Sequence, residues 1–113
     1  MVLSTCFMGS VVVWNVCGLR GRDKKRCVRN LGRKFNIDVL GILETKLENI
    51  NDCIISSVWC RPSRDWYAVP LLGLSGGILC IWNPAYFCVS SCSVRYLYSL
   101  QFELPGILCL CFD

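Results

Sequence analysis

The sequence predicts an α/β fold, with one mixed sheet that carries helices on one face. Two short apolar runs rich in β-branched residues, Val11–Val16 and Ile37–Leu43, have the composition of buried strands. Between them, Arg22–Phe35 repeats its apolar residues with a helical period. A strand, a helix and a strand within about thirty residues form a βαβ unit, whose strands are parallel and whose crossover is right-handed.

The predicted helix Arg22–Phe35 has one apolar stripe and one basic side. The stripe consists of Cys27, Val28, Leu31 and Phe35. Asp23 suits the first turn, because a carboxylate there offsets exposed amide groups, and Asn36 suits the end.

A second helix is predicted over Asn49–Trp59, since its isoleucines and Val58 recur at helical spacing. A loop containing Pro62 follows. We predict strands over Asp65–Pro70 and Ile78–Trp82, separated by a turn that ends in two glycines.

Three antiparallel strands are predicted in the last part of the chain. They cover Phe87–Val94, Tyr96–Leu104 and Ile107–Phe112. The four tryptophans are predicted to belong to the core, because apolar strand or helix residues flank each of them.

Length and composition limit the class of protein. A chain of 113 residues with 54% hydrophobic and 18% charged residues is one domain or a part of one, and its composition excludes disorder. No apolar run reaches the roughly 18 residues that span a bilayer, so we expect no membrane partner. Met1–Trp14 lacks the basic start and cleavage site of a signal peptide, which favours a strand.

The ten cysteines are compatible with two interpretations. Most lie inside apolar runs such as GILCIW and GILCLCF, and the chain contains neither a CxxC motif nor histidine. This pattern favours buried free thiols in a reducing, intracellular compartment, nuclear or cytoplasmic. The alternative is a small secreted Cys-rich protein, which predicts disulfides.

Positive charge is concentrated in one segment. The net charge is +4, but eight of the twelve Lys and Arg residues lie between Arg20 and Lys34, opposed only by Asp23. This segment is either a solvated helix face or a surface for weak, non-specific contact with DNA phosphates. The candidate DNA-binding residues are Arg20, Arg22, Lys25, Arg26, Arg29 and Arg33.

Polar residues end both strands of the βαβ unit. Asn15 lies in the first strand's terminus, and Glu44 follows the second. Parallel strands present their carboxyl ends at the same sheet edge, where open α/β sheets place ligand sites. We therefore expect these two side chains to lie side by side.

Three motifs carry a resemblance to a known family. WNVCGLR, then DVLGILETK, then WYAVP with GLSGGILCIW, is similar to the endonuclease/exonuclease/phosphatase superfamily. The order and spacing resemble in particular the apurinic-type endonuclease domains of plant non-LTR (LINE-type) retrotransposons. The similarity covers nearly the whole chain, but only the N-terminal half of such a domain.

The resemblance implies metal-dependent cleavage of a phosphodiester bond in DNA. It implies a four-layer α/β/β/α sandwich, of which this chain would supply the N-terminal half. Glu44 matches the family's metal-ligating glutamate, and Asn15 matches its catalytic asparagine. The expected metal is Mg²⁺, a hard ion that prefers carboxylate oxygens and water. Cys17 stands where many members carry aspartate, and Leu43 where glutamine usually precedes the glutamate.

The family's later catalytic elements have no counterpart in these 113 residues. They supply a tyrosine, an Asp-x-Asn pair and a terminal Asp-His, whereas this sequence contains no histidine. We therefore expect residues 1–113 to be a partial domain, truncated at its C-terminus and inactive. We also expect the sheet face opposite the helices to be uncovered, so that the chain self-associates through it.

Overall fold

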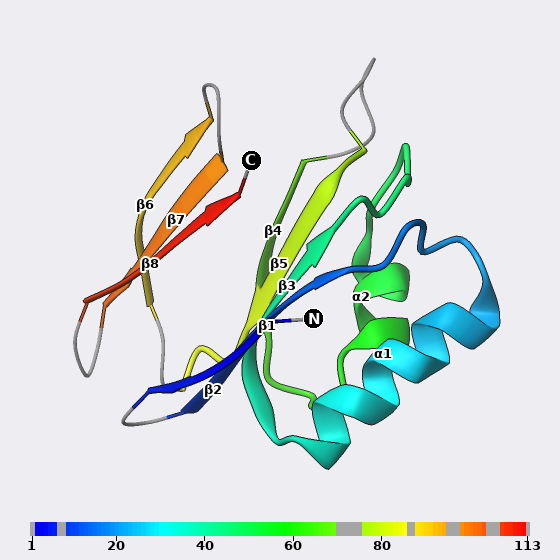
Figure 1. The fold of residues 1–113 in the computed structure, drawn as a ribbon, viewed down its shortest axis with the longest axis horizontal. Coiled ribbons are helices and arrows are strands. Elements are labelled where there is room, and N and C mark those ends of the chain that lie inside the picture. The colour runs from blue at the N-terminus through cyan, green and yellow to red at the C-terminus, as the bar shows by residue number, and fades with distance from the viewer. Residues whose placement is uncertain are drawn as a thin grey trace.

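The computed structural model describes residues 2–6, 9–69, 76–85, 88–94, 98–103 and 107–112. Within these ranges lie two sheets and two helices (Figure 1). The larger sheet has the strand order β1-β2-β3-β5-β4, and the smaller has the order β6-β7-β8. Figure 1 shows α1 and α2 on one side of the larger sheet and β6–β8 on its other side.

The βαβ unit is confirmed. The strand β2 (Gly9–Asn15) pairs in parallel with β3 (Ile37–Leu43), and α1 (Arg22–Lys34) connects them. The helix ends at Phe35, and Asn36 has a left-handed backbone with φ of 51°. Asparagine tolerates this conformation better than most residues, which explains why the helix stops there.

The other strands of the larger sheet extend this unit on both sides. The strand β1 (Val2–Cys6) pairs antiparallel with β2, so the strand favoured within Met1–Trp14 is present and is separate from β2. On the other side, β5 (Ile78–Trp82) pairs antiparallel with β3, and β4 (Asp65–Val69) pairs antiparallel with β5. The sheet is therefore mixed, as predicted, with both predicted strands of its second half in place.

The second helix is shorter than predicted. The helix α2 covers Asp52–Val58, and the Asn51 side chain caps it by accepting a hydrogen bond from the Ile54 amide at 3.1 Å. A cap of this kind fixes where a helix begins, because its backbone is extended rather than helical. The predicted start at Asn49 was therefore too early.

The main core lies between the larger sheet and the two helices. It gathers alternate residues of β2, β3 and β5 with the inner sides of α1 and α2. Its most buried members include Val12, Val28, Leu40, Ile55 and Leu79. Cys27, which the helical stripe had placed in the core, is exposed, so that prediction was wrong. The buried residues of α1 are Val28 and Gly32. Gly32 lies against Cys60, whose sulfur would be 3.6 Å from a Cβ at position 32.

The opposite face of the larger sheet is also buried. Val39 and Cys80 on this face are 0% exposed, and Val11, Ile78 and Trp82 lie with them in a second cluster. The expectation of an uncovered face was therefore wrong for β2, β3 and β5. Figure 1 shows β6–β8 on that side of the larger sheet, as a sheet of their own.

That smaller sheet is antiparallel throughout. The strand β6 (Cys88–Val94) pairs with β7 (Tyr98–Glu103), which pairs with β8 (Ile107–Phe112). The three predicted strands are thus present, each within two residues of its predicted start. The predicted strand end at Pro70 and the GLSG part of the turn lie outside the described residues.

Candidate functional site

Asn15 and Glu44 lie side by side at the carboxyl edge of the larger sheet. Asn15 is the last residue of β2 and pairs in register with Leu43, the last residue of β3. Glu44 follows at once, and the side chains of Asn15 and Glu44 are both exposed. We call this edge, formed by Asn15, Cys17 and Glu44, the strand-end site.

Cys17 joins the two polar residues. Its amide donates to Asn15 Oδ1 at 3.0 Å, and its thiol donates to the same oxygen at 3.3 Å. The Cys17 Sγ also lies 3.9 Å from Glu44 Oε2. An amide oxygen, a thiol and a carboxylate therefore converge in one exposed place.

Backbone hydrogen bonds hold the two strand-end loops together beyond the strands. The loop after β3 is held from both sides, by the loop after β2 and by the start of β5. The bonds run from Val16 N to Leu43 O, Gly18 N to Glu44 O, Leu19 N to Thr45 O, Thr45 N to Gly77 O and Lys46 N to Gly76 O, at 2.6 to 3.3 Å. The position of Glu44 is thus fixed by backbone contacts on both sides.

These loops contain a cluster of left-handed backbone conformations. Cys17, Glu44 and Lys46 have φ of 52°, 55° and 55°, although none of them is glycine. Such conformations cost about 1 to 2 kcal/mol for most residues. They persist where the surrounding structure imposes them, and they cluster at functional sites.

Gly76 permits the close approach of β5 to Glu44. A Cβ at this position would lie 3.1 Å from Glu44 Cγ and 3.2 Å from Glu44 Cα. Sequence reasoning had assigned the two glycines only to a turn. The paired glycines were the available signal, because a glycine beside a strand often marks a close backbone approach.

The strand-end site suits a hard divalent cation in part. The Glu44 carboxylate and the Asn15 carbonyl oxygen are the donor types that Mg²⁺ prefers, with water completing its octahedron. Cys17 supplies a softer donor, which suits Zn²⁺ better than Mg²⁺. Within the residues whose side chains are described, no group of three or more His, Cys, Asp and Glu converges.

The basic segment borders a hollow between the two helices. A cavity of about 390 Å³ is lined by Arg20, Arg22, Lys25, Arg26, Arg29 and Ser57. We call it the α1–α2 groove. Arg33, also predicted to contact DNA, does not line it. Lys24, in the same segment, instead donates to Val16 O at 2.7 Å and ties α1 to the loop after β2.

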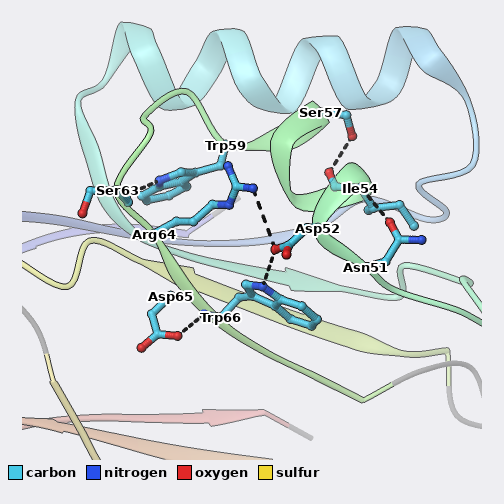
Figure 2. A network of polar contacts seen from close by, with 9 residues as sticks. All are labelled: Asn51, Asp52, Ile54, Ser57, Trp59, Ser63, Arg64, Asp65 and Trp66. Carbon is cyan, nitrogen blue, oxygen red and sulfur yellow. Dashed lines mark hydrogen bonds and ion pairs between the residues drawn. The ribbon is translucent and has the colours of Figure 1, made fainter.

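A polar network fixes α2 against β4 and so positions the Ser57 side of the groove (Figure 2). Asp52 accepts from Trp66 Nε1 at 3.3 Å and lies 3.8 Å from Arg64. Ser57 donates to Ile54 O at 2.6 Å. Beyond the helix, Trp59 Nε1 donates to Ser63 O at 3.1 Å. These contacts hold α2 at both ends.

The cysteines with described side chains are free thiols. Cys17, Cys27 and Cys53 are exposed, Cys60 is half-buried and Cys80 is buried. Burial raises the pKa of the Cys80 thiol far above its ordinary value, because the thiolate would lack solvation there. The side chains of the remaining cysteines lie outside those described.

No helix in the described part of the chain has the length and hydrophobicity needed to cross a bilayer.

The tryptophans behave as predicted. Trp59 and Trp82 are buried, and Trp14 and Trp66 pack against the main core.

Comparison with known proteins gives a structural match. No protein-family model matches the sequence, and no curated protein matches it. The fold is similar to that of the AP endonuclease LMAP from Leishmania major, with a TM-score of 0.60 and 18% sequence identity. The match covers 89% of this chain and 38% of the endonuclease chain, so these residues span well under half of that protein. The chain therefore has the α/β, DNase I-like fold of part of an AP endonuclease.

Proposed function

We propose that this chain is part of a metal-dependent nuclease domain that hydrolyses phosphodiester bonds in DNA. The meeting of Asn15 and Glu44 at the carboxyl edge of two parallel strands carries the proposal. In it, Glu44 binds Mg²⁺ and Asn15 contacts the scissile phosphate. The cation would then polarise a phosphate oxygen and offset the negative charge that develops in the transition state.

The finer assignment is to the endonuclease domain of plant LINE-type retrotransposons, with these residues in its N-terminal half. Its support is the order of three motifs, WNVCGLR, DVLGILETK and WYAVP with GLSGGILCIW. The first two motifs contain the residues of the strand-end site, and the third contributes Gly76 beside Glu44. Such a protein would work inside the cell, in the nucleus or the cytoplasm.

Divalent-metal binding tests the proposed role of Glu44. We expect weak Mn²⁺ binding, measured by calorimetry, that is lost in Glu44→Gln and weakened in Asn15→Ala. The matched control is Glu48→Gln, which removes an exposed carboxylate from the same loop. Equal binding by the Glu44 and Glu48 variants would contradict the proposal.

We further propose that the 113 residues do not cleave DNA on their own. The strand-end site supplies one carboxylate, and the sequence contains no histidine to act as the family's general base. The purified chain should therefore give no Mg²⁺-dependent nicking of supercoiled or abasic plasmid. Nicking that disappears in Glu44→Ala would refute this expectation.

A second candidate function is DNA binding without catalysis. The uneven distribution of charge favours it, since eight cations lie between Arg20 and Lys34. Binding should be weak, independent of sequence and steeply salt-dependent. Changing Lys25, Arg26, Arg29 and Arg33 to Glu should abolish it, as a gel-shift titration would measure.

A secreted Cys-rich protein remains the alternative from a different class. It predicts disulfides and a processed N-terminus. Intact mass after thiol alkylation of the denatured, unreduced chain distinguishes the two, because every free thiol then adds one alkyl group. Ten added groups on an unprocessed chain would exclude the secreted protein.

A further inference from the structure

The α1–α2 groove concentrates positive charge that no carboxylate balances. Five of its six lining residues are cations, and the sixth is Ser57. The ion pairs among the described residues join Arg61 with Asp38 and Arg64 with Asp52, so none involves the groove. The hydrogen bonds of Arg20 and Lys25 go to uncharged carbonyl oxygens, those of Lys46 at 3.1 Å and of Arg20 at 3.5 Å.

The spacing of these cations is unfavourable for an isolated helix. Arg22 and Arg26 are four residues apart, as are Lys25 and Arg29, and like charges at this spacing destabilise a helix. At the amino end of α1 the cap residue, Gly21, provides no side-chain hydrogen bond, and Asp23 in the first turn is the only carboxylate of this helix. A bound polyanion would attract each of these cations and so offset the repulsion between them.

The groove begins beside the strand-end site. The Arg20 side chain donates to the carbonyl of Lys46, two residues after Glu44. From Arg22 to Arg29 the helix rises about 10 Å, at 1.5 Å per residue. At about 3.4 Å per nucleotide, this length corresponds to roughly three nucleotides of one strand.

We propose that the α1–α2 groove binds about three successive phosphates of a nucleic-acid strand, next to the part of that strand at the strand-end site. The inference rests on the proposed nuclease function and adds a path for the substrate. The groove lining contains no aromatic or amide side chain that would recognise a base or sugar. Binding is therefore to the backbone alone and independent of sequence.

A matched pair of variants tests the groove. Arg29→Gln removes a groove cation, whereas Arg33→Gln removes the same charge one turn further along α1. Binding spread over the whole helix, as in the second candidate function, would use Arg33, but the groove does not contain it. Binding of a 12-base-pair duplex would be measured against salt concentration, with the full 113-residue chain and EDTA present. We expect the slope of log K against log salt to become shallower by about 0.9 in Arg29→Gln and to stay unchanged in Arg33→Gln.

The double variant Arg26→Gln with Arg29→Gln extends the test. Its slope should be shallower by about 1.8, since each lost phosphate contact removes about 0.9. Circular dichroism would check that every variant keeps its fold. Equal slope changes in Arg29→Gln and Arg33→Gln would overturn the proposal, because they would mean diffuse attraction over the whole helix. Unchanged slopes in all variants would overturn it too.

Two further measurements identify the ligand and separate the groove from the metal site. Inorganic tripolyphosphate at a one-to-one ratio should not displace the duplex. Stoichiometric displacement would overturn the proposal in favour of a small oligophosphate ligand. Because the salt slope is measured in EDTA, it does not depend on a metal ion at the strand-end site. If the groove does not bind phosphates, the salt slopes of the variants show it. If Glu44 does not bind metal, the Mn²⁺ titration shows it.

Discussion

At the scale of single residues, Cys17 places a thiol in the strand-end site, where a carboxylate would add negative charge. Its thiol occupies a place between Asn15 Oδ1 and Glu44 Oε2. Its backbone is left-handed, with φ of 52°, a conformation that Asp and Asn tolerate better than Cys. Aspartate at position 17 would add a second carboxylate to the site, and it also tolerates this backbone conformation.

We predict that Cys17→Asp strengthens binding of Mg²⁺ and Mn²⁺ at least tenfold, as measured by calorimetry. A second carboxylate beside Glu44 supplies another hard ligand and more negative charge. The control is Cys17→Asn, which has the same shape and backbone preference without the charge. If both variants bind metal equally, charge at this position does not control the site.

Gly76 gives a second prediction at this scale. Gly76→Ala should destabilise the chain by about 1 to 3 kcal/mol in urea unfolding, since the added methyl meets the backbone of Glu44 at 3.2 Å. It should also weaken Mn²⁺ binding by displacing Glu44. In Gly21→Ala, by contrast, the new Cβ has no neighbour within 4 Å, and the expected loss is below about 1 kcal/mol. Comparable losses in the two variants would contradict this account.

At the scale of elements, an ion pair with a buried carboxylate ties β3 to the loop after α2. Asp38 on β3 is buried, and Arg61 pairs with its carboxylate while also donating to Asn36 Oδ1. The other pair, Arg64 with Asp52, involves a carboxylate that is 78% exposed. The two pairs are close in sequence but differ in burial.

We expect Arg61→Ala to destabilise the chain by about 3 to 5 kcal/mol, because it leaves the Asp38 carboxylate buried without a partner. Arg64→Ala should cost less than about 1 kcal/mol, since water screens an exposed pair. Urea unfolding at neutral pH measures both. A loss in Arg61→Ala as small as that in Arg64→Ala would show that water solvates Asp38.

At the scale of the whole molecule, we infer that the smaller sheet shields the second face of the larger sheet from solvent, since it lies on that side (Figure 1). Cys80 reports on this face, because its thiol is fully buried there and burial raises its pKa. Protonated, buried thiols react slowly with alkylating reagents. Cys27 and Cys53, on the helices, are exposed and provide internal references.

We predict that iodoacetamide labels Cys27 and Cys53 readily in the native chain but leaves Cys80 unlabelled, as peptide mass mapping would show. A chain ending at residue 85 lacks β6–β8 and should expose Cys80 and the neighbouring valines. It should then bind apolar dyes and self-associate, measurable by sedimentation. Rapid labelling of Cys80 in the full chain would mean that β6–β8 do not cover this face.

The sequence by itself determined the elements and the meeting of the two polar strand ends. Helical periodicity located α1, and continuous apolar runs located β3 and β5, almost to the residue. The two strands read as apolar runs because both of their faces are buried. The parallel crossover then followed from chain geometry, and it brought Asn15 and Glu44 to one edge.

The tertiary structure alone decided how the elements group and what the site touches. The apolar pattern of the last three strands does not say which sheet they join, so the separate β6–β8 sheet and the burial of Cys80 were not predictable. The contacts of Cys17 with Glu44, of Gly76 with Glu44 and of Arg61 with Asp38 join residues more than twenty positions apart. Such contacts depend on packing in three dimensions, which local periodicity does not encode.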